Sequence, residues 1–131
     1  MPAKLLVIDD QPGIGAIVAR IAASLGLDTQ VVGDPMQAIE AFVSFSPDAV
    51  VLDLVMPEKD GIELLEEMIL TGHPAMFIIM SGYGEAYLRL AEGVARFHGI
   101  KPPIVLRKPF DRAELTELLR SVRPLGPTTS A

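Results

Sequence analysis

The sequence has no cysteine, no long apolar run and no cluster of positive charge, and each absence narrows what the protein can be. Without cysteine there are no disulfides and no thiolate metal ligands. The longest apolar stretches, such as Ala75 to Met80, are far shorter than the roughly 20 residues that a membrane-spanning helix needs. The residues from Met1 to Lys4 lead straight into a strand-like run and lack the layout of a signal peptide. We therefore expect a cytoplasmic protein that does not contact the membrane.

The charge balance argues against direct binding of nucleic acid. The formal net charge is −6, and the lysines and arginines are scattered, whereas phosphate contacts need grouped cations. The 131 residues fit one domain, and the apolar half of them is enough to fill one core. We expect a single domain over residues 1–123. Residues 124–131, which are rich in proline, glycine and small side chains, are expected to form a disordered tail or the stub of a linker.

Short apolar runs alternate with segments of helical period along the whole chain. Ile14, Ile17, Ile21 and Leu25, for example, fall on one stripe of a helix that Gly26 ends. The predicted strands are 4–8, 29–32, 49–52, 75–80 and 104–107, and the predicted helices are 14–25, 34–45, 60–70, 84–97 and 111–123. Five strand–helix units in series predict a parallel sheet with helices on both faces, and strands that are continuously apolar agree with burial on both sides.

Polar side chains follow four of these strands. Asp9 and Asp10 follow the first strand, Asp53 the third, Ser81 the fourth and Lys108 the fifth. If the first strand lies between the second and the third, these side chains converge at the carboxyl ends of the strands, where open sheets of this kind bind ligands. Three carboxylates need more positive charge than one lysine supplies, and Mg²⁺ binds carboxylates together with phosphate oxygens. A metal beside a nucleophilic carboxylate suits phosphoryl transfer.

Each of these residues, taken singly, has an ordinary structural explanation. An acidic pair after a strand is usually a helix cap or part of a turn, and Asp53 has the position of a cap for the third helix. Ser81-Gly82 is common turn chemistry, and Lys108-Pro109 fits any loop. The placement of all of them at the same edge of the sheet is what favours a functional site.

The order and spacing of these residues resemble the receiver domains of two-component response regulators. The resemblance covers roughly residues 4–123, and its motifs are Asp9-Asp10, Asp53-Leu54-Val55-Met56-Pro57 with Asp60-Gly61, Ser81-Gly82 and Lys108-Pro109-Phe110. It implies a flavodoxin-like, doubly wound α/β domain with a five-stranded parallel sheet of order 2-1-3-4-5 and five helices. It also implies a signalling switch that a sensor histidine kinase or a phosphotransfer protein phosphorylates, and that catalyses its own phosphorylation and dephosphorylation.

The same resemblance assigns the acidic residues. Asp53 is the nucleophile that becomes aspartyl phosphate. Asp10 binds Mg²⁺ directly and Asp9 binds it mostly through water, while Asp53 and the backbone carbonyl of Val55 complete the metal ligands. Mn²⁺ is expected to substitute for Mg²⁺.

The remaining motif residues act on the phosphoryl group or shape the loops around it. Ser81 is expected to hydrogen-bond the phosphoryl group and Lys108 to pair with one of its oxygens. The Lys108-Pro109 peptide bond is expected to be cis, as in the family. Gly61 is expected to relieve crowding where the third helix starts.

The chain also departs from the family pattern. Receivers usually carry a tyrosine or phenylalanine three residues before the lysine, and here that residue is Val105. The stretch between Ser81 and Lys108 is longer than usual and includes 99–103. Because helix four, strand five and helix five form the output face in the family, we expect an unusual partner or a phosphorylation-dependent homodimer on this face. Val55 and Tyr83 flank the path of the hydrolytic water, which predicts slow autodephosphorylation.

Two histidines and several methionines are expected to have no chemical role. His73 and His98 are expected to face solvent. The methionines are expected to fill the core: Met56, Met68, Met76 and Met80. The alternatives to a working receiver are a pseudo-receiver that acts without phosphorylation, and a hydrolase of the haloacid dehalogenase type. The hydrolase family has an Asp-x-Asp motif after its first strand, where this chain has Asp9-Asp10-Gln11.

Overall fold

The structure, a computed structural model, describes residues 2–82 and 84–125. The strands are β1 (Lys4–Ile8), β2 (Asp28–Val32), β3 (Ala49–Asp53), β4 (Met76–Ser81) and β5 (Ile104–Arg107). The helices are α1 (Pro12–Ser24), α2 (Ala38–Phe45), α3 (Gly61–Leu70), α4 (Glu85–Phe97) and α5 (Arg112–Arg120), with a 3₁₀ turn, η1, at Pro35–Gln37. In these ranges no helix is both long and apolar enough to cross a membrane.

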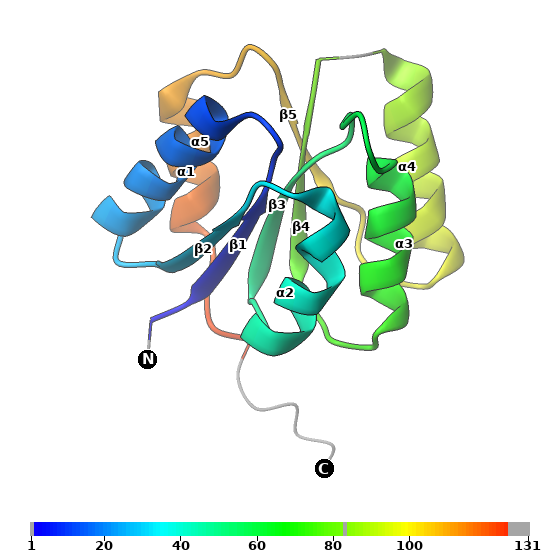
Figure 1. Cartoon of the computed structure of the whole chain (residues 1–131), viewed down its shortest axis with the longest axis horizontal. Helices are drawn as coiled ribbons and strands as arrows, with labels where there is room; N and C mark the ends of the chain where they lie inside the picture. Colours follow the sequence, from blue (N-terminus) through cyan, green and yellow to red (C-terminus); the bar gives the residue numbers. More distant parts are fainter. Residues whose placement is uncertain (1, 83, 126–131) are drawn as a thin grey trace.

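The five strands form one parallel sheet in the order β2-β1-β3-β4-β5, which confirms the predicted doubly wound fold with five α-helices in the described part of the chain. Helices α1 and α5 cover one face of the sheet, and α2, α3 and α4 cover the other (Figure 1). Each layer has its own core, centred on Val18 and Leu115 on the first face and on Phe42 and Leu65 on the second.

Burial of the strands follows their place in the sheet. All five residues of β3 are buried, and so are four of the five in β1, because helices cover both faces of these central strands. The edge strand β2 is different, since only Val32 is buried. In β5, the other edge strand, only Leu106 is buried. The expectation of burial on both sides is therefore wrong for these two strands, each of which has a neighbouring strand on one side only.

Several element boundaries differ from the predicted ones. The predicted helix at 34–45 begins as the 3₁₀ turn η1, in which the Asp34 side chain accepts a hydrogen bond from the Met36 N–H, and becomes α-helical only at Ala38. Helix α5 ends at Arg120 and not near Arg123. Pro124 contributes to the early end, because a proline has no N–H to donate to the Arg120 carbonyl and disfavours helical backbone at Arg123.

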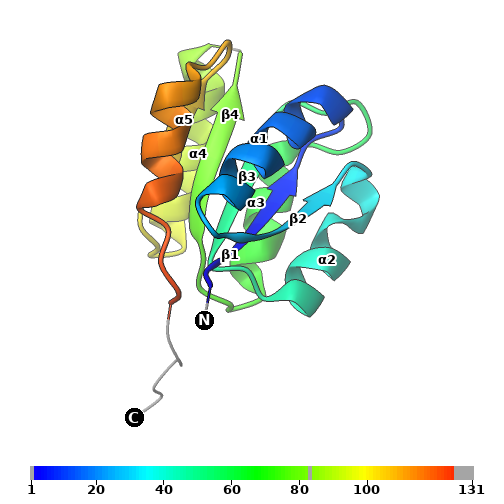
Figure 2. The ribbon, with the colours of Figure 1, turned by 90° about the vertical axis from the view of Figure 1, so that its left-hand side faces the viewer.

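Of the predicted tail, Pro124 and Leu125 are described, and 126–131 lie outside the described residues. The Leu125 N–H donates to the Asp48 carboxylate at 2.9 Å. The end of α5 and the start of β1 lie at the same end of the sheet, opposite the carboxyl ends of the strands (Figure 2). The chain therefore enters and leaves this domain far from the predicted site.

Candidate phosphoacceptor and metal site

The strand register brings the predicted site residues to one level of the sheet. Ile8 of β1 pairs with Leu52 of β3, so that the next residues, Asp9 and Asp53, lie side by side. Ser81 and Arg107 are paired at the ends of β4 and β5, and Lys108 follows directly. From the sequence, Asp53 and Ser81 are expected to be the first residues after their strands. In the structure they are the last residues of β3 and β4.

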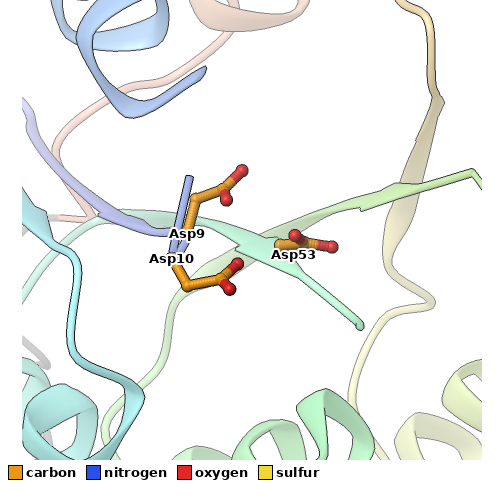
Figure 3. Close-up of side chains that lie close together, drawn as sticks. All are labelled: Asp9, Asp10 and Asp53. Atoms are coloured by element: carbon orange, nitrogen blue, oxygen red, sulfur yellow. The ribbon is translucent and has the colours of Figure 1, made fainter. Parts of the chain in front are cut away.

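The three carboxylates are neighbours. Asp9 and Asp10 leave the end of β1 beside Asp53 at the end of β3 (Figure 3). One carboxylate oxygen from each residue lies within 4.8 Å of the others. The buried polar or charged residues in the described part of the chain are Asp9, Asp53 and Ser81, each at most 4% exposed as a whole residue, and all of them belong to this site. The core is thus apolar except where the predicted chemistry is located.

Lys108 supplies the positive charge that faces the acids. Its ammonium nitrogen is 3.2 Å from Asp53 Oδ2 and 3.6 Å from Asp9 Oδ2. The Lys108 backbone N–H donates to the Ser81 carbonyl at 2.9 Å, which fixes the lysine relative to the end of β4. The Lys108–Pro109 peptide bond is cis, as predicted.

Backbone N–H groups bind the carboxylates of Asp9 and Asp53 at the oxygen that does not face Lys108. The Val55 N–H donates to Asp53 Oδ1 at 3.1 Å, and the Gln11 N–H donates to Asp9 Oδ1 at 2.8 Å. Each of these acids therefore has one oxygen fixed by backbone and its second oxygen directed to Lys108.

Burial changes the titration of Asp9. Burial raises the pKa of Asp9 above its ordinary value, the Gln11 N–H and the Lys108 ammonium oppose this rise, and the Asp53 and Asp10 charges add to it. Asp9 Oδ2 is buried and has no hydrogen-bond partner in the described part of the chain, because Lys108 at 3.6 Å is too far for a hydrogen bond. A buried, unsatisfied carboxylate oxygen beside two further carboxylates fits a hard divalent cation such as Mg²⁺.

The loop after Asp53 is held tightly. Val55 and Asp60 form an isolated antiparallel bridge across it, and the Gly61 N–H donates to the Leu54 carbonyl at 3.0 Å. A Cβ on Gly61 would lie 2.5 Å from the Leu54 Cα and oxygen, so only glycine fits there. The predicted reason for Gly61, close approach at the start of α3, is confirmed. Val55 is 38% exposed as a whole residue, whereas Tyr83 lies outside the described residues.

The prediction that His73 and His98 face solvent is wrong. His73 is half-buried and its Nε2 lies 2.7 Å from the Pro47 carbonyl oxygen. The side chain of His98 is 17% exposed and its Nε2 lies 2.9 Å from Glu66 Oε2. Both line an open groove of about 1060 Å³ at the end of the sheet opposite the acids. Their contacts join segments 26 and 32 residues apart, a separation that no local pattern reveals.

The methionine prediction is confirmed, because Met56, Met68 and Met80 are buried and Met76 is half-buried against the core. Val105 is also half-buried and packs against the core on the α3–α4 side.

Tyr87 of α4 belongs to none of the sequence motifs, yet it makes a contact beside the site. Its hydroxyl donates to Asp60 Oδ1, and this contact joins α4 to the loop that carries Val55.

Comparison with known proteins gives a consistent result. The family described as "Response regulator receiver domain" matches residues 5–120. Sporulation initiation phosphotransferase F of Bacillus subtilis is 30% identical over 125 residues, which cover 95% of this chain and 97% of that protein. Response regulator MprA of a Mycobacterium species is 30% identical over 99% of this chain, and the chain spans about half of its length, 53%. The structure of Vibrio cholerae chemotaxis protein CheY4 has the same fold, with a TM-score of 0.80, 19% identity and coverage of 94% of this chain and 100% of that one.

Proposed function

The chain belongs to the response regulator receiver domain family, and on this basis we propose that it accepts a phosphoryl group on Asp53. The donor is a phosphohistidine on a sensor histidine kinase or on a phosphotransfer protein, and the modification switches the binding of an output partner. The observation that carries the proposal is the position of Asp53 Oδ2, 3.2 Å from the Lys108 ammonium and within a cluster of three carboxylates.

The transfer exchanges one bond for another. The Asp53 Oδ2 lone pair forms a bond to phosphorus while the phosphorus–nitrogen bond to the donor imidazole breaks, and that electron pair stays on the imidazole nitrogen. Lys108 faces the oxygens of the incoming group and balances their charge, and the Ser81 hydroxyl at the end of β4 donates a hydrogen bond to one of them. Such transfer depends on positioning and charge balance, which groups fixed by the ends of strands can supply.

Asp9, Asp10, Asp53 and the backbone carbonyl of Val55 are proposed to hold Mg²⁺, with Mn²⁺ as a substitute that favours the same oxygen ligands. The bound cation neutralises the acids and the phosphoryl oxygens. The unsatisfied Asp9 Oδ2 supports this assignment, because a buried carboxylate without enough counter-charge is unfavourable.

The output partner is proposed to bind the face formed by α4, β5 and α5, and a phosphorylation-dependent homodimer through this face is part of the proposal. Ser81 and Lys108 support it, since Ser81 ends β4 before α4 and Lys108 directly follows β5 before α5. We also propose a cytoplasmic location and no direct binding of nucleic acid, in agreement with the net charge of −6.

Incubation with acetyl phosphate and Mg²⁺, followed by intact mass measurement, tests the proposal. The wild type is expected to gain one phosphoryl group, and Asp53→Ala is expected to gain none. Asp28→Ala is the matched control, because Asp28 is exposed at the start of β2, at the other end of the sheet. A wild type that takes up no phosphoryl group in the presence of Mg²⁺ would favour a pseudo-receiver, and undiminished uptake by Asp53→Ala would exclude Asp53 as the acceptor.

A further inference from the structure

In the described part of the chain, two polar contacts fasten α4 to α3 and its N-cap, one near each end of α4. At the beginning of α4, the Tyr87 hydroxyl donates to Asp60 Oδ1, just before α3. At the end of α4, His98 Nε2 lies 2.9 Å from Glu66 Oε2 of α3. The two contacts are alike in linking one ring to one carboxylate across the same helix pair. They differ in the further contacts that connect each acidic residue to the rest of the protein.

Asp60 is attached to the loop that follows the phosphoacceptor. Its Oδ1 also accepts the Ile62 N–H at 2.9 Å and so caps α3. Its backbone is bridged to Val55, whose N–H in turn holds Asp53 Oδ1. A continuous chain of contacts therefore runs from the Tyr87 hydroxyl through Asp60 and Val55 to Asp53. Glu66, in the middle of α3, has no such connection among the described contacts.

We propose that Tyr87 is a positioning residue for the phosphoacceptor site: its hydroxyl holds Asp60, and through the Val55–Asp60 bridge it keeps the loop that carries Val55 in place for the metal and for Asp53. The inference rests on the proposed function, because the proposed function is what assigns this loop a role in binding Mg²⁺. It adds a residue outside the loop, on α4, whose contact with Asp60 spans 27 positions of the chain.

The surroundings of Tyr87 suit this role. Burial, the hydrogen bond to Asp60 and the Asp60 charge raise the pKa of Tyr87 to about 12, so the hydroxyl keeps its proton and remains a donor at neutral pH. The ring packs against the core on the α3–α4 side, as Val105 does. A variant that keeps the ring and removes only the hydroxyl therefore separates positioning from packing.

Coupling between the contact and the metal must be reciprocal. If the Tyr87 hydroxyl stabilises the loop conformation that binds Mg²⁺, then Mg²⁺ must strengthen the Tyr87–Asp60 contact to the same extent. The NMR signals of the Tyr87 ring, identified by their loss in Tyr87→Phe, are therefore expected to shift when Mg²⁺ is added to the wild type. A tyrosine that only packs against the core has no reason to respond.

The experiment compares wild type, Tyr87→Phe and His98→Phe. Calorimetric titration with Mg²⁺ gives the dissociation constant, and urea unfolding gives the stability of each protein. Tyr87→Phe is expected to bind Mg²⁺ about three- to tenfold more weakly, because one hydrogen bond to a charged group is lost and part of its free energy is coupled to the site. His98→Phe breaks the other α3–α4 contact, and is expected to keep its Mg²⁺ affinity within about twofold, since distant sites without shared partners act independently.

Phosphorylation by acetyl phosphate at saturating Mg²⁺, measured in the same three proteins, separates this inference from the proposed function. If Tyr87→Phe binds Mg²⁺ as tightly as the wild type does, the positioning role is overturned. If His98→Phe loses as much Mg²⁺ affinity as Tyr87→Phe does, the positioning role is also overturned, because a general loosening of α4 then explains both losses. If the wild type takes no phosphoryl group while the affinities follow the expected order, the proposed function fails and the positioning role stands. A wild type that binds no Mg²⁺ overturns both.

Discussion

Replacing Asp10 by asparagine should change the stability of the protein in opposite directions with and without Mg²⁺. The wild-type site holds three carboxylates with oxygens within 4.8 Å of one another, and one lysine faces them. Two unit charges at this separation repel by about 3.5 kcal/mol at an effective dielectric constant of about 20. Asp10 is half-buried, so water screens much of this repulsion. We expect Asp10→Asn to stabilise the metal-free protein by about 1 kcal/mol.

Binding of Mg²⁺ to the folded state alone stabilises the wild type by mass action. At a Mg²⁺ concentration a hundred times the dissociation constant, the gain is about 2.7 kcal/mol. For a chain of 131 residues, an unfolding entropy of about 2.1 cal/mol/K per residue converts this gain to a rise in Tm of about 10 °C. The relief of repulsion in metal-free Asp10→Asn corresponds in the same way to about 4 °C.

Thermal unfolding followed by circular dichroism, with EDTA and with Mg²⁺, tests both effects. Asp10→Asn should melt above the wild type in EDTA and lose most of the response to Mg²⁺. Asp28→Asn is the control, because it makes the same change at an exposed position at the other end of the sheet. A full Mg²⁺ response in Asp10→Asn would exclude Asp10 as a direct ligand. A metal-free Asp10→Asn that melts below the wild type would refute the repulsion argument.

Four further substitutions give separate tests. Lys108→Ala is expected to retain Mg²⁺ binding but lose the conformational response to phosphorylation, so the phosphorylated variant should lack amide shifts across α4 that the wild type shows. Gly61→Ala should destabilise the protein by about 2 kcal/mol or more in urea unfolding, because its Cβ would meet the Leu54 backbone. Gly93→Ala in α4, where a Cβ meets nothing within 4 Å, should instead stabilise it by about 0.5–1 kcal/mol. Val55→Asn should speed the decay of the phosphorylated protein several-fold, since the apolar Val55 side chain can neither orient nor deprotonate a water, and equal decay rates would show that Val55 does not control that water.

The sequence was sufficient to predict where the strands lie along the chain, the fold class and which acidic residues come together. Central strands read as continuous apolar runs because they are buried on both faces, and β3 is the clearest case. Asp9 and Asp53 could be placed together from the sequence alone, because the carboxyl ends of parallel strands meet at one edge of the sheet. Boundaries were less certain, as α5 shows, because a proline four residues beyond its end changes the local backbone and leaves the apolar pattern intact.

The tertiary structure decided the contacts between elements. The Tyr87–Asp60 and His98–Glu66 contacts join residues 27 and 32 positions apart, and neither pair belongs to a repeating pattern. The exposure of β2 likewise depends on its place at the edge of the sheet, which the family resemblance implied but the residues of the strand alone do not show. Local sequence determines which side of a helix or strand is apolar, since that depends on the period of the element. Which polar groups meet across two packed helices depends on how the whole chain brings those helices together.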